Sequence, residues 1–104
     1  MICQICKKVM PFKKKNRKYY FEAIELFNDF DREMEEFYIA LCPLCAAMYN
    51  EFVKHDEGAM ESLKNALINS EDTEVPLQLG ELDTSVRFVE SHFLDIRTII
   101  EAQE

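Results

Sequence analysis

Cys3-Gln-Ile-Cys6 opens the sequence, Cys42-Pro-Leu-Cys45 repeats its spacing near the middle, and the two stretches hold all four cysteines of the 104 residues. A Cys-x-x-Cys turn brings two thiolates to one ion, and zinc favours a tetrahedron of four ligands, with sulfur about 2.3 Å from the metal. The sequence therefore predicts one structural zinc site with Cys3, Cys6, Cys42 and Cys45 as its ligands. Such a shell has no position for water or substrate, so we expect the ion to hold the fold rather than to perform chemistry.

Two other interpretations of the cysteines stay open. A dithiol redox motif needs only one Cys-x-x-Cys pair, so the second pair would go unexplained. Disulfides are typical of secreted chains, and nothing resembling a signal peptide precedes Cys3. The gap between Cys6 and Cys42 exceeds the about 15 to 20 residues of short zinc ribbons, so we expect the intervening segment to be structured.

The composition is that of one folded domain. Hydrophobic residues make up 48% of the chain, including eight Phe and four Tyr, and no apolar run reaches the ~20 residues of a membrane span. We expect a soluble protein of a reducing compartment, the cytoplasm, with no membrane partner and no small-molecule substrate. Because the first knuckle follows Met1-Ile2 directly, we hypothesise that the module is excised from a longer chain.

Positive charge is concentrated at the N-terminus. Residues 1–18 carry seven of the twelve Lys and Arg and no acid, whereas residues 19–104 carry the other five and all 20 acids. A loop over residues 7–18, with Phe12 within it and two tyrosines after it, could contact phosphates while an aromatic ring stacks on a base. The candidate nucleic-acid contacts are Lys13, Lys14, Lys15, Arg17 and Lys18. The alternative is a solvated loop that balances the thiolate charge.

The first half of the chain predicts a hairpin-like basic loop, two strands and a helix. Alternation predicts strands over residues 19–26 and 37–41, and the second strand delivers Cys42. An acidic connector joins them over residues 28–36, with Asp29, Asp31, Glu33, Glu35 and Glu36. Pro43 suits the first turn of a helix that we expect to run to about Lys54. Its apolar stripe consists of Leu44, Met48 and Phe52 beside Cys45, Tyr49 and Val53.

The second half predicts a helix, a β-hairpin and a last helix. Gly58 is expected to separate the first helix from a second one over residues 59–69, followed by a polar linker. Strands over residues 75–79 and 85–90 flank a turn at 80–83, and Ser91 is expected to cap a helix over 92–102. The predicted buried residues are Met60, Leu63, Leu67, Val75, Leu77, Leu79, Val86, Phe88, Phe93, Ile96 and Ile100.

These elements suggest one domain, residues 1–104, in three parts. They are a zinc module over 3–54, a helix over 55–70 and a hairpin with its helix over 74–104. Residues 75–100 are a candidate surface for a protein partner or a second copy of the chain.

The sequence Cys3-x-x-Cys6, the segment Tyr20-Phe21-Glu22-Ala23 and the segment Tyr38-Ile39-Ala40-Leu41-Cys42-Pro43-x-x-Cys45 together resemble the treble-clef framework of HNH endonucleases. The resemblance covers about residues 3–54. It implies a small α+β treble-clef zinc-binding domain, here with an added helix and a β-hairpin plus C-terminal helix, and it favours contact with nucleic acid.

The catalytic histidines of that family have no counterpart here. Where tandem histidines would follow Glu22-Ala23, the sequence has Ile24 and Glu25, and after Cys45 it has Ala46, Ala47 and Asn50. A base to activate water and an imidazole set to hold a catalytic ion are therefore missing. The resemblance implies a non-cleaving relative and not an enzyme. His55 and His92 are interpreted as a residue favouring a helix C-terminus and as a surface or packing residue.

Overall fold

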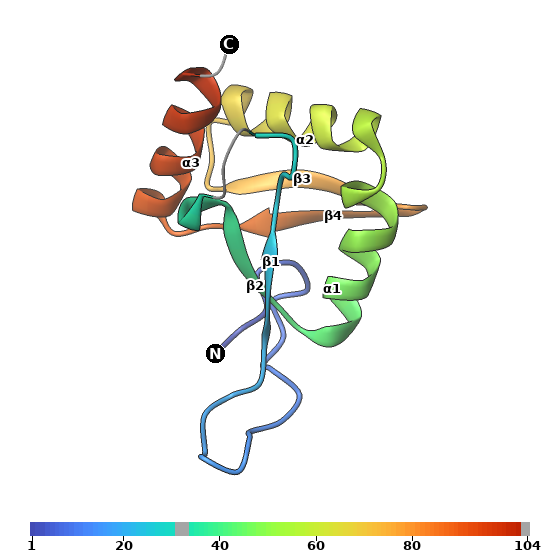
Figure 1. Cartoon of the computed structure of the whole chain (residues 1–104), viewed down its shortest axis with the longest axis vertical. Coiled ribbons are helices and arrows are strands. Elements are labelled where there is room, and N and C mark those ends of the chain that lie inside the picture. Colours follow the sequence, from blue (N-terminus) through green and yellow to red (C-terminus); the bar gives the residue numbers. More distant parts are fainter. Residues whose placement is uncertain (31–33, 103–104) are drawn as a thin grey trace.

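The computed structural model describes residues 1–30 and 34–102, and it shows two antiparallel two-stranded sheets and three α-helices (Figure 1). The predicted α+β class is confirmed. Two residues of the predicted acidic connector, Asp31 and Glu33, lie outside the described residues. Within the described ranges, no helix combines the length and the apolar character needed to cross a membrane.

The first sheet pairs β1 (Glu22–Glu25) with β2 (Tyr38–Leu41), with Ile24 opposite Ile39. The strand predicted over residues 19–26 is too long, because Tyr19 pairs instead with Lys13 in an isolated bridge of the basic loop. The second strand was predicted over residues 37–41, but in the structure it begins one residue later, at Tyr38. A 3-10 turn, η1 (Glu35–Phe37), precedes β2 and buries its last side chain.

The helix that begins between the two cysteines of the second pair covers the predicted residues. It consists of α1 (Pro43–Tyr49), which has Pro43 at its start, and a π-helical turn, η2 (Asn50–Lys54), which continues it. Proline fits the first helical turn because its missing N–H would have no partner there.

The buried face of this helix is one residue away from the centre of the predicted stripe. Leu44 and Phe52 are 69% and 41% exposed, whereas Cys45, Tyr49 and Val53 are buried. The row that starts at Leu44 and the row that starts at Cys45 both repeat every four residues, so periodicity alone does not show which row is buried. Cys45 must face the other cysteines, and this orientation turns Tyr49 and Val53 into the core. The Tyr49 hydroxyl donates to the Leu26 carbonyl at 2.8 Å, which satisfies its one buried polar group.

The second α-helix, α2 (Glu57–Asn69), starts two residues before its predicted beginning. The Asp56 carboxylate accepts a hydrogen bond from the Ala59 backbone N–H at 3.1 Å, a typical N-cap. Gly58 therefore lies in the first turn of α2 and does not separate two helices.

The C-terminal part is a tight hairpin followed by a helix. The strands β3 (Glu74–Leu79) and β4 (Leu82–Arg87) are joined by Gly80 and Glu81 alone, so the predicted four-residue turn is too long. Gly80 has a φ of 63°, which glycine adopts without strain. The last helix, α3 (Glu90–Ala102), begins before Ser91, so this residue is not its N-cap.

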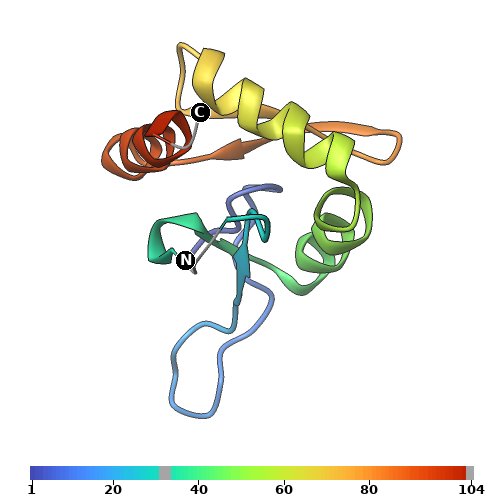
Figure 2. The ribbon, with the colours of Figure 1, turned by 45° about the horizontal axis from the view of Figure 1, so that its top comes forward.

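The predicted core residues of the second half are confirmed as buried. They are Met60, Leu63, Leu67, Val75, Leu77, Leu79, Val86, Phe88, Phe93, Ile96 and Ile100. The hairpin β3–β4 lies between α2 on one side and the N-terminal segment on the other (Figures 1 and 2). One hydrophobic cluster joins both halves of the chain. The basic loop projects from one end of the molecule, whose extents are 44 × 29 × 27 Å.

Candidate metal centre

The first cysteine pair sits in a tight turn at the N-terminus. The Lys7 N–H donates to the Cys3 carbonyl at 3.0 Å, and the Cys3 N–H donates to the Lys8 carbonyl at the same distance. Ile2 and Val9 pair in an antiparallel bridge beneath the turn. Lys7 has a φ of 62°, a left-handed conformation that reverses the chain after Cys6. These bonds direct both sulfurs to the inside of the turn.

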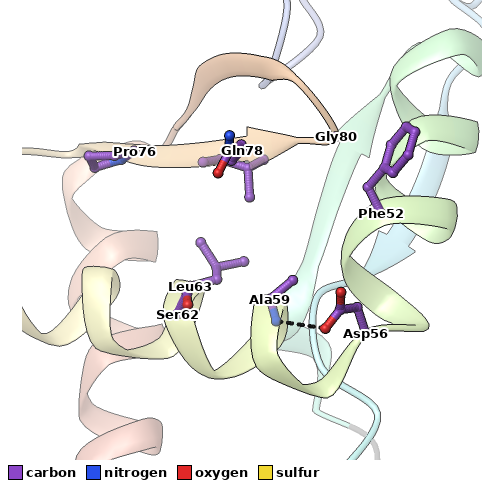
Figure 3. A pocket seen from close by; sticks show the side chains of 9 residues that line it. Phe52, Asp56, Ala59, Ser62, Leu63, Pro76, Gln78 and Gly80 are labelled. Atoms are coloured by element: carbon purple, nitrogen blue, oxygen red, sulfur yellow. Dashed lines mark hydrogen bonds between the residues drawn. The ribbon is translucent and has the colours of Figure 1, made fainter.

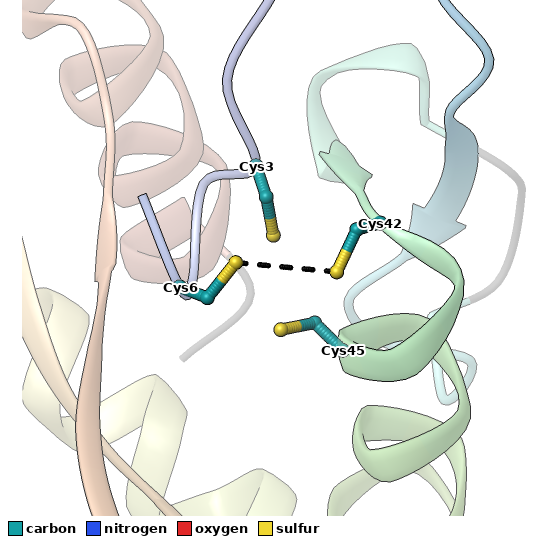
Figure 4. A group of neighbouring side chains, drawn as sticks. All are labelled: Cys3, Cys6, Cys42 and Cys45. Atoms are coloured by element: carbon teal, nitrogen blue, oxygen red, sulfur yellow. Dashed lines mark hydrogen bonds between the residues drawn. The ribbon is translucent and has the colours of Figure 1, made fainter. Parts of the chain in front are cut away.

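The second cysteine pair sits where β2 passes into α1. Cys42 has extended backbone angles and is the N-cap residue of α1, and its carbonyl accepts from the Ala46 N–H at 2.9 Å. Cys45 lies within the first turn of the helix and is 5% exposed. The strand and the helix therefore present both sulfurs to the N-terminal turn (Figure 4).

The four sulfur atoms form one cluster. All lie within 4.8 Å of one another, and the Cys6 and Cys42 sulfurs are 4.0 Å apart. A tetrahedral zinc with sulfurs at about 2.3 Å separates them by about 3.8 Å, so small shifts would close the shell around an ion. A disulfide needs a sulfur–sulfur distance of about 2.05 Å, and the structure has all four cysteines as free thiols. The donor set therefore fits a thiophilic metal.

Electrostatics within the cluster also favours a cation. Burial raises the pKa of the Cys45 thiol, and neighbouring Cys42 and Cys3 raise it further. Burial likewise is the main cause of the raised pKa of Cys6. Burial acts against ionisation of Cys3 too, but backbone N–H groups of Cys42, Cys6 and Ile5 stabilise its thiolate and lower its pKa to about 7. The protein alone thus stabilises the Cys3 thiolate, whereas a bound positive charge would favour ionisation of Cys6 and Cys45.

Gln4, between the first two cysteines, joins the cluster to both sheets. Its side-chain oxygen accepts from the Ala40 N–H at 2.8 Å, and its side-chain nitrogen donates to the Arg87 carbonyl at 2.9 Å. Its backbone N–H and carbonyl bond to the same two residues, at 3.0 and 2.8 Å. Gln4 could not be singled out from the sequence, because the middle positions of a Cys-x-x-Cys turn carry no pattern that indicates such contacts.

Comparison with family models, with curated proteins and with solved structures found no match for this chain. The resemblance to HNH endonucleases therefore stays a prediction. The positions that depart from that family have other contacts in the structure. Ile24 is half-buried in β1, the Glu25 carboxylate lies 3.9 Å from the Lys54 ammonium, and Ala46 is buried.

The predicted nucleic-acid contacts all lie in one exposed hairpin. Residues 12–20, called the basic hairpin below, contain Lys13, Lys14, Lys15, Arg17 and Lys18, and these five side chains are exposed. Lys7 of the predicted loop has a different role. Its ammonium donates to the Ser85 carbonyl at 2.8 Å and to the Ser85 hydroxyl at 2.6 Å, so it holds the first knuckle against β4.

The two histidines have different surroundings. His92 lies in the first turn of α3, where its Nε2 is 2.6 Å from the Glu36 carbonyl and its ring meets the Phe88 ring edge-on. Nε2 must donate in this contact because a carbonyl can only accept. His92 thus packs and bonds between α3 and η1, in line with the packing role considered for it. His55 is exposed at the end of η2.

A groove of about 290 Å³ lies between α2, η2 and the β3 strand (Figure 3). Of the described residues that line it, only Asp56 is titratable, and its carboxylate caps α2. Apolar contacts come from Phe52, Leu63 and Pro76. The groove therefore brings together no pair of acid and base groups.

The segment over residues 75–100 uses most of its apolar side chains inside the chain. Its buried residues belong to the core described above, and Leu82, Val89 and Leu94 are its large apolar side chains with exposed fractions near or above one half. The docking of a partner or second copy on this segment stays a prediction.

Proposed function

We propose that the chain is a structural zinc module of treble-clef type, in which Cys3, Cys6, Cys42 and Cys45 hold one Zn²⁺. The observation that carries this proposal is the cluster of four sulfur atoms within 4.8 Å. The order of the elements supports it further, since a cysteine turn, a β-hairpin and a helix with the second cysteine pair at its start follow one another. A closed thiolate shell supplies folding free energy rather than a reactive water.

Cobalt(II) substitution tests the ligand set. Tetrahedral thiolate coordination should give the cobalt-loaded chain intense visible and near-ultraviolet absorption. Cys45→Ser should weaken cobalt binding by more than the about 10- to 100-fold typical of losing an outer-shell partner. Leu44→Ser is the matched control, because it changes the adjacent, exposed residue to the same side chain. Equal cobalt affinity in the two variants would contradict the proposed ligand set.

In this proposal the module is non-catalytic and related to the HNH proteins. The support is in the residues that replace the family's histidines, Ile24, Glu25, Ala46, Ala47 and Asn50. None of them offers an imidazole to hold a catalytic ion. A metal-dependent nuclease assay on the zinc-loaded chain tests this point, and cleavage that Leu44→Ser leaves intact while Glu25→Gln abolishes it would refute it.

We further propose that the module is an accessory nucleic-acid contact within a larger protein. The support is the charge distribution, because residues 1–18 carry a local charge of +7 whereas residues 19–104 carry −15. A polyanion is attracted to the first region and repelled by the second. The basic hairpin projects from the body, so phosphates can approach its exposed cations (Figure 1).

A further inference from the structure

The basic hairpin carries an aromatic surface as well as charge. The rings of Phe12 and Tyr20 are stacked, with centroids 4.9 Å apart and planes inclined by 12°. Tyr20 is half-buried at the base of the hairpin, while Phe12 is 52% exposed. Phe12 therefore keeps a large open ring surface beside the exposed cations, although such a ring would be better buried.

Backbone hydrogen bonds hold this ring in place before any ligand arrives. The Tyr20 N–H donates to the Phe12 carbonyl at 3.0 Å, and the Lys14 N–H donates to the Lys18 carbonyl at 2.8 Å. The tip is closed by Arg17, whose φ is 67°, and by the Asn16 side chain, which accepts from the Lys18 N–H. A ligand that stacks on Phe12 thus incurs little ordering cost in the protein.

One cation is engaged within the hairpin and the rest are open to a ligand. The Lys13 ammonium lies 4.9 Å from the centroid of the Tyr19 ring, on the residue with which Lys13 pairs. No ion pair of the described residues involves Lys14, Lys15, Arg17 or Lys18. These four cations are therefore available to phosphates along a short path.

The position of the hairpin favours a flexible ligand over a duplex. Double-stranded DNA is stiff over about 150 base pairs, so a duplex touching the tip would extend past it without wrapping around it. The bases within a duplex are also stacked on each other, so away from its ends a duplex offers no free base face to Phe12. A single strand bends around a small tip, and each of its bases has a free π-face.

We propose that the basic hairpin binds single-stranded nucleic acid in preference to duplex, with one base stacked on Phe12 and the neighbouring phosphates on Lys14, Lys15, Arg17 and Lys18. This inference rests on the proposed nucleic-acid role of the hairpin and adds the class of ligand. The recognised groups are a base face and phosphates, which single-stranded DNA and RNA share.

A tryptophan at position 12 provides a direct reporter, because the protein contains no tryptophan. The zinc-loaded Phe12→Trp chain is titrated at low salt with oligothymidylate, with oligouridylate and with a blunt DNA duplex, each about ten nucleotides or base pairs long. A base stacked on the ring should quench the tryptophan fluorescence. We expect saturable quenching by one or both single strands and affinity at least about tenfold lower for the duplex.

Two further variants test whether stacking on the Phe12 ring itself accounts for the binding and for the quenching. Phe12→Leu keeps an apolar contact on Tyr20 but removes the aromatic face, and it should lower single-strand affinity about tenfold while leaving duplex affinity unchanged. Phe52→Trp is the fluorescence control, since Phe52 is 41% exposed on η2, away from the hairpin, and its tryptophan should not be quenched. Unchanged thermal unfolding of Phe12→Leu would show that the domain remains folded.

Two results would overturn the inference. If duplex and single strands bind equally well and the fluorescence of the Phe12→Trp chain is not quenched, the stacking proposal fails while the proposed nucleic-acid contact stands. If none of the three ligands binds, the nucleic-acid contact fails as well. The thiolate site is untouched by either result.

Discussion

Gln4 shows what a single side chain contributes between the two sheets. The four cysteines could be predicted as a set because their spacing is typical of metal ligands, whereas Gln4 has no such pattern around it. Its amide satisfies the Ala40 N–H in β2 and the Arg87 carbonyl at the end of β4. The residue therefore connects the turn of Cys3 and Cys6 to both sheets of the fold.

Replacing Gln4 by alanine should destabilise the folded chain. The substitution leaves the partly buried Ala40 N–H and the exposed Arg87 carbonyl without their side-chain partner. We expect the free energy of unfolding to fall by about 1–2 kcal/mol. For a domain of this size, each kcal/mol lowers the thermal midpoint by about 4–8 °C. Thermal unfolding of the zinc-loaded variant measures this shift.

Lys8→Ala is the control for that experiment. Lys8 belongs to the same turn, and its exposed side chain makes no hydrogen bond or ion pair with the described residues. Its replacement should change stability by no more than about 0.5 kcal/mol. Equal midpoints for Gln4→Ala and Lys8→Ala would show that the Gln4 contacts contribute nothing.

At the scale of elements, the sequence predicted the type and order of the helices and strands better than their ends. The helix after Cys42 was expected over the right residues. The prediction of its buried face was only partly correct, because Leu44 and Cys45 begin two rows of side chains with equal spacing and only the Cys45 row is buried. The start of α2 depends on the Asp56 side chain, and the Gly80-Glu81 turn depends on one positive φ. A capping hydrogen bond and a single backbone angle leave the hydrophobic periodicity unchanged, so periodicity reveals neither of them.

The exposure and the hairpin-like form of the basic hairpin could be predicted from the sequence, whereas the contacts that order it could not. A run of lysines is typical of a solvated loop, and the cross-strand bonds that close this one involve backbone groups and the Phe12–Tyr20 stack. Phosphate contact by its cations predicts salt-dependent binding, since each neutralised phosphate releases counterions.

Changing Lys13, Lys14 and Lys15 together to Gln should abolish most of that binding. The variant should bind a single-stranded oligonucleotide at least about tenfold more weakly at low salt. Its salt slope should fall by about 1.4, because two of the proposed phosphate contacts, Lys14 and Lys15, are removed. Fluorescence anisotropy of a labelled oligonucleotide at several salt concentrations measures both quantities.

A second triple variant, Asn65→Asp, Asn69→Asp and Gln78→Glu, is the charge-matched control. It also lowers the net charge by three, at exposed positions outside the hairpin. If the two triple variants lose affinity equally, overall charge and not the hairpin governs binding.

The whole molecule depends on contacts that its N-terminal turn makes with distant segments. Cys3 and Ile5 are fully or nearly fully buried in the common core, and Lys7 and Gln4 bond to β4 near the other end of the chain. A zinc ion on Cys3, Cys6, Cys42 and Cys45 would hold this turn against α1. Losing the ion would therefore affect the docking of β3, β4 and α3 as well as the turn itself.

Typical energies predict that the proposed zinc ion decides whether the chain folds. Structural zinc contributes apparent binding free energies of about 10–16 kcal/mol in small modules. A domain of this size has a net stability of only about 5–15 kcal/mol. We therefore expect the metal-free chain to be unfolded, because the clustered sulfurs would repel one another on ionising in the folded state.

Far-UV circular dichroism during metal removal shows whether the folded chain depends on a bound zinc ion. The zinc content of the full chain is measured by elemental analysis as a chelator is added, and the spectrum is recorded at each step. The account predicts one zinc per chain at the start, loss of the helical signal in parallel with the metal, and its return when zinc is restored. A chain that keeps its full helical signal with no metal bound would contradict it.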